Sequence, residues 1–274
     1  MTSALDGWRI GFIGCGAMAR ALCGGLLAAG VPKSHVRATD VVAPQRASFA
    51  QEFGVETGGD NGQLVEASDI LVVCVKPGAV VPMLSALPAA AAPDSKLWIS
   101  IAAGVRIATL ERALGPASRV VRVMSNTPAL IGEGASVLSP NSRTSDADRA
   151  AADALFSAVG TTWEAPTESM LDAVTGLSGS GPAYVFLILE ALGDAGVRQG
   201  LPRDAAYQLA FQTVIGAARL AQQSGRHPAS LKDQVTSPGG TTIAGLEQLE
   251  AGGVRSAIYN AVDAATRRSR ELGE

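Results

Sequence analysis

One short stretch near the C-terminus combines residue types that could hold a small carboxylate. Residues Val235–Thr242 read VTSPGGTT. Ser237 before Pro238 predicts an N-cap followed by a first helical position. Gly239 and Gly240 then leave backbone N–H groups unshielded, and a helix start carries unpaired donors and a partial positive charge. The stretch therefore suits a carboxylate, although the same pattern also fits a tight turn that merely begins a helix.

A second stretch, close to the N-terminus, could hold a pyrophosphate. Trp8–Ile13 reads as a buried strand, and Gly14-Cys15-Gly16-Ala17-Met18-Ala19 leads from it into an apolar helix that continues through Ala29. Two glycines allow a tight turn and let the backbone approach phosphate oxygens at the helix start, and Ala19 is an accepted small third residue. This position between a strand and a helix predicts dinucleotide binding.

The choice between the two nicotinamide coenzymes depends on the second strand, His35–Asp40. Asp40 falls where an acidic residue meets the ribose 2′-hydroxyl, and its charge would repel a 2′-phosphate. Arg46 is near enough in sequence to offer a phosphate partner instead, and Asp40 could simply start a turn. The sequence leaves NADH and NADPH open.

The elements that must position these residues predict a two-domain α/β protein. Three further apolar strands end at polar turns, and Gly132–Leu138 and Gly160–Glu164 look like closing strands, for which the sequence allows an antiparallel direction. A helix over 146–158 separates these two. Alternation of strands and helices predicts a Rossmann-like, doubly wound parallel sheet over residues 1–165. Helical stretches fill residues 166–274, which predicts an all-α dimerisation and substrate-binding domain.

Composition excludes several classes of function. The chain has 274 residues, a net charge of −3 and 4% aromatic residues, which argues against nucleic-acid binding. Three cysteines without ligand spacing and two histidines argue against a metal site and against a Ser-His-Asp triad. The N-terminus does not resemble a signal peptide, and the longest apolar run, Ala183 to Leu189, is too short to span a bilayer. We expect a soluble cytoplasmic protein.

Several separate motifs give the chain a resemblance to the pyrroline-5-carboxylate reductase family. Besides Val235–Thr242, they are Val75-Lys76-Pro77, the loop Ser100–Gly104, Ser125–Pro128 after Met124, and Gly176–Tyr184. The resemblance covers nearly the whole chain. It implies reduction of the cyclic imine 1-pyrroline-5-carboxylate to L-proline, the last step of proline biosynthesis, with NADPH or NADH as cofactor. It also implies an interlocked homodimer core in which the substrate loop meets the nucleotide domain, with larger homo-oligomers left open.

The resemblance also implies site residues. It places the cofactor contacts at Ile13, Gly14, Cys15, Gly16, Ala17, Met18, Asp40, Asn61, Cys74, Val75, Lys76, Pro77, Ala102, Ala103 and Asn126. It places the substrate contacts at Glu168, Ser180, Ser237, Gly239, Gly240, Thr241 and Thr242, of which Thr242 is the catalytic candidate that hydrogen-bonds the ring nitrogen. Plainer explanations stay open for three of them. Asn61 could be a helix cap, Lys76 a solvated lysine and Glu168 a first-turn carboxylate.

Two other functions remain compatible with the sequence. One is another NAD(P)-dependent imine or 3-hydroxy-acid dehydrogenase of the same architecture. The 3-hydroxy-acid enzyme would need a lysine or histidine as acid and base, and Lys232 is the only lysine of the helical half. A regulatory protein that binds NAD(P)H without turnover would not oxidise the cofactor in the presence of the imine. The apolar helix at 183–189 and the Ala-rich helix at 203–223 are expected to be buried between subunits.

Overall fold

The fold is taken from a computed structural model that describes residues 2–88 and 95–273. The chain divides into two compact units, one formed by Met1–Gly179 with Ala265–Glu274 and the other by Ser180–Ala264. The division expected from sequence, near residue 165, lies upstream of this structural division, and as a functional boundary it stays a prediction.

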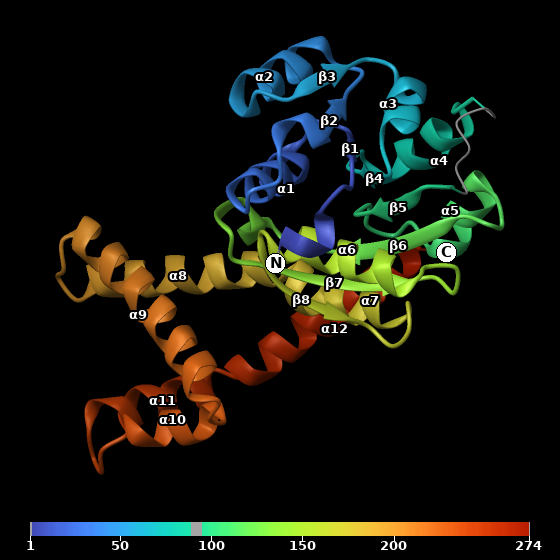
Figure 1. The fold of residues 1–274 in the computed structure, drawn as a ribbon. Helices are drawn as coiled ribbons and strands as arrows, with labels where there is room; N and C mark the ends of the chain where they lie inside the picture. Colours follow the sequence, from blue (N-terminus) through green and yellow to red (C-terminus); the bar gives the residue numbers. More distant parts are fainter. Residues whose placement is uncertain (1, 89–94, 274) are drawn as a thin grey trace. The chain divides into compact units, whose positions relative to one another are not determined.

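The first unit is built on one sheet in the order β3-β2-β1-β4-β5-β6-β7-β8 (Figure 1). Its strands are β1 (Ile10–Ile13), β2 (Val36–Thr39), β3 (Glu56–Gly58), β4 (Ile70–Val73), β5 (Leu97–Ser100), β6 (Arg119–Met124), β7 (Gly134–Pro140) and β8 (Gly160–Glu164). Strands β1 to β6 pair in parallel, whereas β7 is antiparallel to β6 and parallel to β8. This confirms the doubly wound sheet and the reversed direction of the closing strands.

Helices cover both faces of the sheet. Successive strand residues point to opposite faces, so each strand contributes to two cores. Ile70 and Val72 of β4 join a core with α1, α2 and α6, while Leu71 and Val73 join a second core with α3, α4 and α5. The helices of this unit are α1 (Ala17–Ala28), α2 (Ala43–Phe53), α3 (Asn61–Ala67), α4 (Pro77–Ser85), α5 (Ile107–Leu114), α6 (Asp146–Ser157) and α7 (Met170–Val174).

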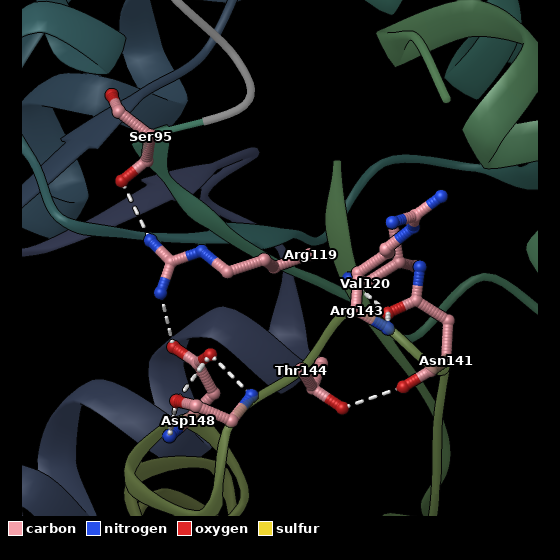
Figure 2. A network of polar contacts seen from close by, with 8 residues as sticks. Ser95, Arg119, Val120, Asn141, Arg143, Thr144 and Asp148 are labelled. Atoms are coloured by element: carbon pink, nitrogen blue, oxygen red, sulfur yellow. Dashed lines mark hydrogen bonds and ion pairs between the residues drawn. The ribbon is translucent and has the colours of Figure 1, made fainter. Parts of the chain in front are cut away.

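An ion pair between Arg119 and Asp148 fixes helix α6 against the start of β6. Asp148 is fully buried and accepts from Arg119 Nη1 at 2.6 Å, and Arg119 Nη2 donates to the carbonyl of Ser95 at 2.6 Å (Figure 2). The other oxygen of Asp148 accepts from the backbone N–H and the hydroxyl of Ser145, which completes a capping box at the start of α6. The carboxylate thus joins a helix start to a strand.

The second unit consists of helices. They are α8 (Gly181–Arg198), α9 (Arg203–Ser224), α10 (Pro228–Gln234), α11 (Thr241–Ala251) and the first part of α12 (Val254–Leu272). Helices α8 and α9 pack against each other (Figure 1). The ring of Tyr207 lies on Gly193, where an added Cβ would stand 2.8 Å from ring atoms. Among the described residues, no helix is both long and apolar enough to cross a membrane.

Candidate active site

The carboxyl ends of the parallel strands collect most of the residues expected to contact the cofactor. Gly14 follows β1, Asp40 follows β2, Cys74 follows β4 and Ala102 follows β5 closely. The order of strands reverses between β1 and β4, and open α/β sheets bind ligands at such a switch point. All of these residues belong to the first unit.

The glycine loop after β1 has the geometry that phosphate binding requires. Gly14 has φ +103°, and a Cβ there would stand 2.8 Å from the carbonyl oxygen of Cys74, so only glycine fits. Gly16 is the N-cap of α1 in extended conformation, and no atom lies within 4 Å of its missing Cβ. The first N–H groups of α1, from Ala17 and Met18, precede the first i→i−4 bond, which runs from Arg20 to Gly16. The space beside Gly16 is therefore open at the start of α1, where these donors lie.

Asp40 is tied to the glycine loop by its carboxylate. One carboxylate oxygen accepts from the N–H of Cys15 at 2.8 Å and the other from the N–H of Val42 at 2.8 Å. Arg46 Nη1 donates to the backbone carbonyl of Asp40 at 2.6 Å. The carboxylate is thereby fixed in orientation at the end of β2, whichever sugar hydroxyl or phosphate it faces.

Asn61 is not the helix cap that the sequence allowed. The cap of α3 is Asp60, whose Oδ1 accepts from the N–H groups of Gly62 and Gln63. Asn61 is the first helical residue, and its side-chain oxygen accepts from the hydroxyl of Thr39 at 2.7 Å. It therefore joins α3 to the end of β2, beside Asp40.

The turn after β4 contains one cysteine and an exposed lysine. Lys76 is exposed and is the N-cap residue of α4, with Pro77 at its first position. Burial raises the pKa of the Cys74 thiol well above its usual range, and it raises the pKa of the Cys15 thiol to about 11. Both thiols are therefore protonated at neutral pH, and neither is a nucleophile there.

Asn126 connects the end of β6 to two other segments. Its amide nitrogen donates to the carbonyl of Ser178 at 3.0 Å, and its oxygen accepts from the N–H of Ala135 at 2.9 Å. Ser178 belongs to a π-helical turn, η6 (Thr175–Gly179), which ends the first unit. Ser180, which opens the second unit, directly follows this turn and is the N-cap residue of α8.

Glu168 lies in the turn before α7, and its carboxylate caps the start of α5. Its Oε1 accepts from the N–H of Ile107, at the start of α5, and from Nη1 of Arg122, each at 2.8 Å. The Arg122 side chain is only 5% exposed, so this carboxylate neutralises a nearly buried cation. The same atom thus has two partners within the first unit.

The substrate loop differs from the expected helix start. Gly239 has φ +65°, which a right-handed helix does not accommodate, so the helix begins after Gly240 and not at Pro238. The N–H of Gly240 donates to the carbonyl of Ser237 at 3.1 Å and closes a turn. Hence the helix-start donors are the N–H groups of Thr241, Thr242 and Ile243, and the N–H of Gly240 is used within the turn. The prediction that Ser237 is the N-cap was wrong.

Two family models match this chain, one over each half. The model described as pyrroline-5-carboxylate reductase dimerisation matches residues 168–272, and the model described as NADP oxidoreductase coenzyme F420-dependent matches residues 9–104. The pyrroline-5-carboxylate reductase of Methanosarcina acetivorans is 46% identical over 271 residues, covering 98% of this chain and 100% of the relative. The chain belongs to the pyrroline-5-carboxylate reductase family.

Other members of the pyrroline-5-carboxylate reductase family agree over the same length. The enzyme of Pisum sativum is 45% identical, with 97% of each chain covered. A solved pyrroline-5-carboxylate reductase from Coxiella burnetii superposes with a TM-score of 0.89 at 36% identity, covering 98% of this chain and 100% of that one. The pyrroline carboxylate reductase of Plasmodium falciparum, solved with NADP bound, gives 0.88 at 33% identity, covering 98% and 99%. The helical half is thus the family's dimerisation domain.

Two residues that hold candidate site residues in place were not predicted from the sequence. Thr39 holds Asn61, and Arg122 holds Glu168. Arg122 carried a signal, since it is a charged residue inside the apolar strand Arg119–Met124. A charge buried in a sheet requires a partner, but sequence alone does not say which carboxylate provides it.

Proposed function

We propose that this chain is an NAD(P)H-dependent pyrroline-5-carboxylate reductase that converts 1-pyrroline-5-carboxylate to L-proline. The observation that carries the proposal is the 46% identity to a pyrroline-5-carboxylate reductase along its entire length. The reaction would complete proline biosynthesis in the cytoplasm. The chain works as a homo-oligomer, because its helical half is the dimerisation domain of this family.

The glycine loop and the strand ends would hold the cofactor. Gly16 and the first amides of α1 offer donors to the pyrophosphate beside open space, which fits a dinucleotide. The carboxylate of Asp40 would face the ribose, and the small residues Ala102 and Ala103 leave room for a flat ring against the backbone. When bound, the cofactor supplies the hydride.

The start of α11 would hold the imine acid. The N–H groups of Thr241, Thr242 and Ile243 are free of helical partners and carry the positive end of the helix dipole, which suits the carboxylate. The Thr242 hydroxyl would hydrogen-bond the ring nitrogen, and Ser237 and Ser180 would line the same pocket. An iminium carbon is already electrophilic, so rate would come mainly from proximity and orientation.

A spectrophotometric assay tests the activity. We expect oxidation of NADPH or NADH only when 1-pyrroline-5-carboxylate is present, with L-proline as the product by chromatography. Thr242→Val keeps the shape of the side chain and removes its hydroxyl. Loss of one hydrogen bond to a charged group costs about 1.5–3 kcal/mol, or roughly ten- to a hundred-fold in kcat/KM.

A matched variant controls for the loss of a threonine from the helical unit. Thr213→Val removes a hydroxyl of α9 that donates to its own helix at Leu209 and lies outside the substrate loop, so kcat/KM should not change. Cofactor binding without oxidation in the presence of the imine would instead indicate a non-catalytic binding protein. Turnover of a 3-hydroxy acid would indicate the other dehydrogenase class.

A further inference from the structure

The loop after β5 makes few strong bonds of its own. It contains Ala102 and Ala103, the proposed neighbours of the nicotinamide ring. Its internal backbone bond, from Val105 to Ala102, measures 3.3 Å, and the N–H of Ala102 lies 3.4 Å from the hydroxyl of Ser100. Both distances are at the long end for hydrogen bonds, so the shape of this loop depends on its surroundings.

The C-terminal segment, residues 265–273, supports one side of this loop. The carbonyl oxygen of Leu272 lies 3.1 Å from where a Cβ on Gly104 would stand, and Gly104 has φ +77°. Two residues later, Arg106 Nε donates to the carbonyl of Gly273 at 2.9 Å. The loop therefore touches the C-terminal segment at two successive carbonyl groups.

The C-terminal segment is in turn fixed to helix α7. The hydroxyl of Ser269 donates to Asp172 Oδ1 at 2.7 Å, and both side chains are buried. The other oxygen of Asp172 lies 4.0 Å from Arg106 Nη2. Arg106, Asp172 and Ser269 thus form a closed set of contacts among the loop, α7 and the end of α12.

Glu168 holds the same loop from its far end. It lies just before α7 and binds the N–H of Ile107, the residue that follows Arg106. Arg122 of β6 orients the carboxylate by a 2.8 Å ion pair. The segment Gly104–Ile107 is consequently clamped by a carboxylate on one side and by the C-terminal carbonyl groups on the other.

We infer that Glu168 and the C-terminal segment are positioning groups that set the shape of the loop bearing Ala102 and Ala103, and thereby the rate of hydride transfer. The inference rests on the proposed function, since it takes that loop to line the nicotinamide. The groups act through the loop backbone. They should affect kcat strongly and cofactor affinity weakly, because the pyrophosphate is bound at the glycine loop.

Two variants release the clamp without touching the proposed substrate or cofactor contacts. Arg106→Ala removes the bond to the Gly273 carbonyl, and deletion of residues 272–274 removes the carbonyl groups themselves. Ser269→Ala is a milder third variant that keeps the chain length and cuts the bond to Asp172. Arg112→Ala is the matched control, because this exposed arginine of α5 donates to Thr109 of the same helix and has no contact with the clamp among the described residues.

Three measurements on the full-length oligomer test the inference. In the absence of cofactor, amide hydrogen exchange over residues 101–105 should be faster in the clamp variants than in the parent and unchanged in Arg112→Ala. Steady-state kinetics should show kcat lowered by about tenfold, equivalent to about 1.4 kcal/mol of barrier. The cofactor Kd, from fluorescence titration, should change by less than about threefold. Arg106→Lys, which keeps a donor, should recover part of kcat.

Unchanged exchange over residues 101–105, or faster exchange with an unchanged kcat, would overturn the inference. So would parallel losses of kcat and cofactor binding that match the loss of folded protein, which is the pattern of a merely structural contact. If the deletion does not fold, Ser269→Ala and Arg106→Ala decide between these outcomes. An inactive parent enzyme would contradict the proposed function instead, and the exchange experiment would still report on the clamp.

Discussion

The two compact units differ in how they bury apolar surface. In the first unit, apolar strand residues alternate between two continuous cores, each covered by helices of the same unit. In the second unit, the residues described as buried are Gly193, Ala206 and Ala210, whereas large side chains such as Phe186 and Leu187 are more than 60% exposed. Exposed apolar surface of this extent marks an interaction surface. The nucleotide unit can complete its core alone, and the helical unit needs a partner chain.

The two units also differ in how completely their polar groups are hydrogen-bonded. Asp40, Asn126 and Glu168 each bind two partners within the first unit, so their orientations are fixed before any ligand arrives. The loop that leads to Thr241 and Thr242 is largely exposed, and its helix-start donors have no helical acceptor. The polar side chains of the first unit are therefore preorganised, whereas the second unit has helix-start N–H groups that are available to bind a ligand.

The largest effect should follow the removal of Asp148, whose carboxylate is fully buried in the first unit. Asp148→Ala removes the carboxylate that pairs with Arg119, leaves that cation only the carbonyl of Ser95 among the contacts described above, and opens the capping box of α6. We expect a loss of about 3–5 kcal/mol in the free energy of unfolding, independent of protein concentration. Denaturant titration measures it. Asp146→Ala, an exposed carboxylate in the same helical turn, should cost less than about 1 kcal/mol, and equal losses in the two variants would contradict this role.

A charge in the exposed apolar face of α8 should break assembly rather than the first unit. Leu187 is 66% exposed in the single chain, and Leu187→Asp would place an unpaired carboxylate between subunits. The expected cost to association is about 3 kcal/mol or more, seen by light scattering as monomer or aggregate. Leu187→Met, a swap of similar volume, should remain a homo-oligomer. A folded dimer carrying the aspartate would place the interface elsewhere.

Alkaline pH should lower the free energy of unfolding of the first unit, because the pKa values of its buried thiols are raised. Burial raises the pKa of Cys15 to about 11 and that of Cys23 to about 12, from an ordinary value of 9.0. A raised folded-state pKa stabilises the fold below the unfolded pKa, and this contribution is lost as pH rises from 9.0 through the folded values. Each thiol should lower the unfolding free energy by about 1.4 kcal/mol per pH unit in that range. Cys23→Ala should flatten the slope above pH 9; an unchanged slope would show that Cys23 does not titrate there.

The smallest effect concerns coenzyme choice. Asp40→Ser removes the charge that would repel a 2′-phosphate, and it also removes acceptors for the N–H groups of Cys15 and Val42. We expect the ratio of kcat/KM for NADPH to that for NADH to rise by about fivefold, which corresponds to about 1 kcal/mol. Both coenzymes should bind less tightly, because the glycine loop loses the hydrogen bond from the N–H of Cys15 to Asp40. An unchanged ratio would mean that Asp40 does not face the ribose.

Local patterns in the sequence predict the fold well where they are long and apolar. The strand at Ile70–Val73 and the glycine turn at Gly14 followed from such patterns. Strand β3 was missed because Glu56–Gly58 is short, lies at the sheet edge and is not apolar. The helix at about 241–251 was predicted, but its cap was placed wrongly at Ser237, because Gly239 adopts a positive φ that the sequence allows but does not require.

Long-range polar contacts could not be predicted in the same way. Glu168 was assigned to the substrate from a motif, whereas its partners, Ile107 and Arg122, lie 61 and 46 residues away in the sequence. Nothing in the spacing of these residues links them. Only the folded sheet brings the start of α5, strand β6 and the segment before α7 together.

The most direct test of the contrast between the two units is a dilution series of the parent protein. Cofactor affinity, from fluorescence, and imine reduction per chain, from absorbance, would be measured across the concentration range in which light scattering shows the oligomer dissociating. The account predicts that cofactor Kd stays constant while reduction per chain falls with the fraction of oligomer. Full reduction by a dissociated chain would contradict it, and so would loss of cofactor binding on dissociation.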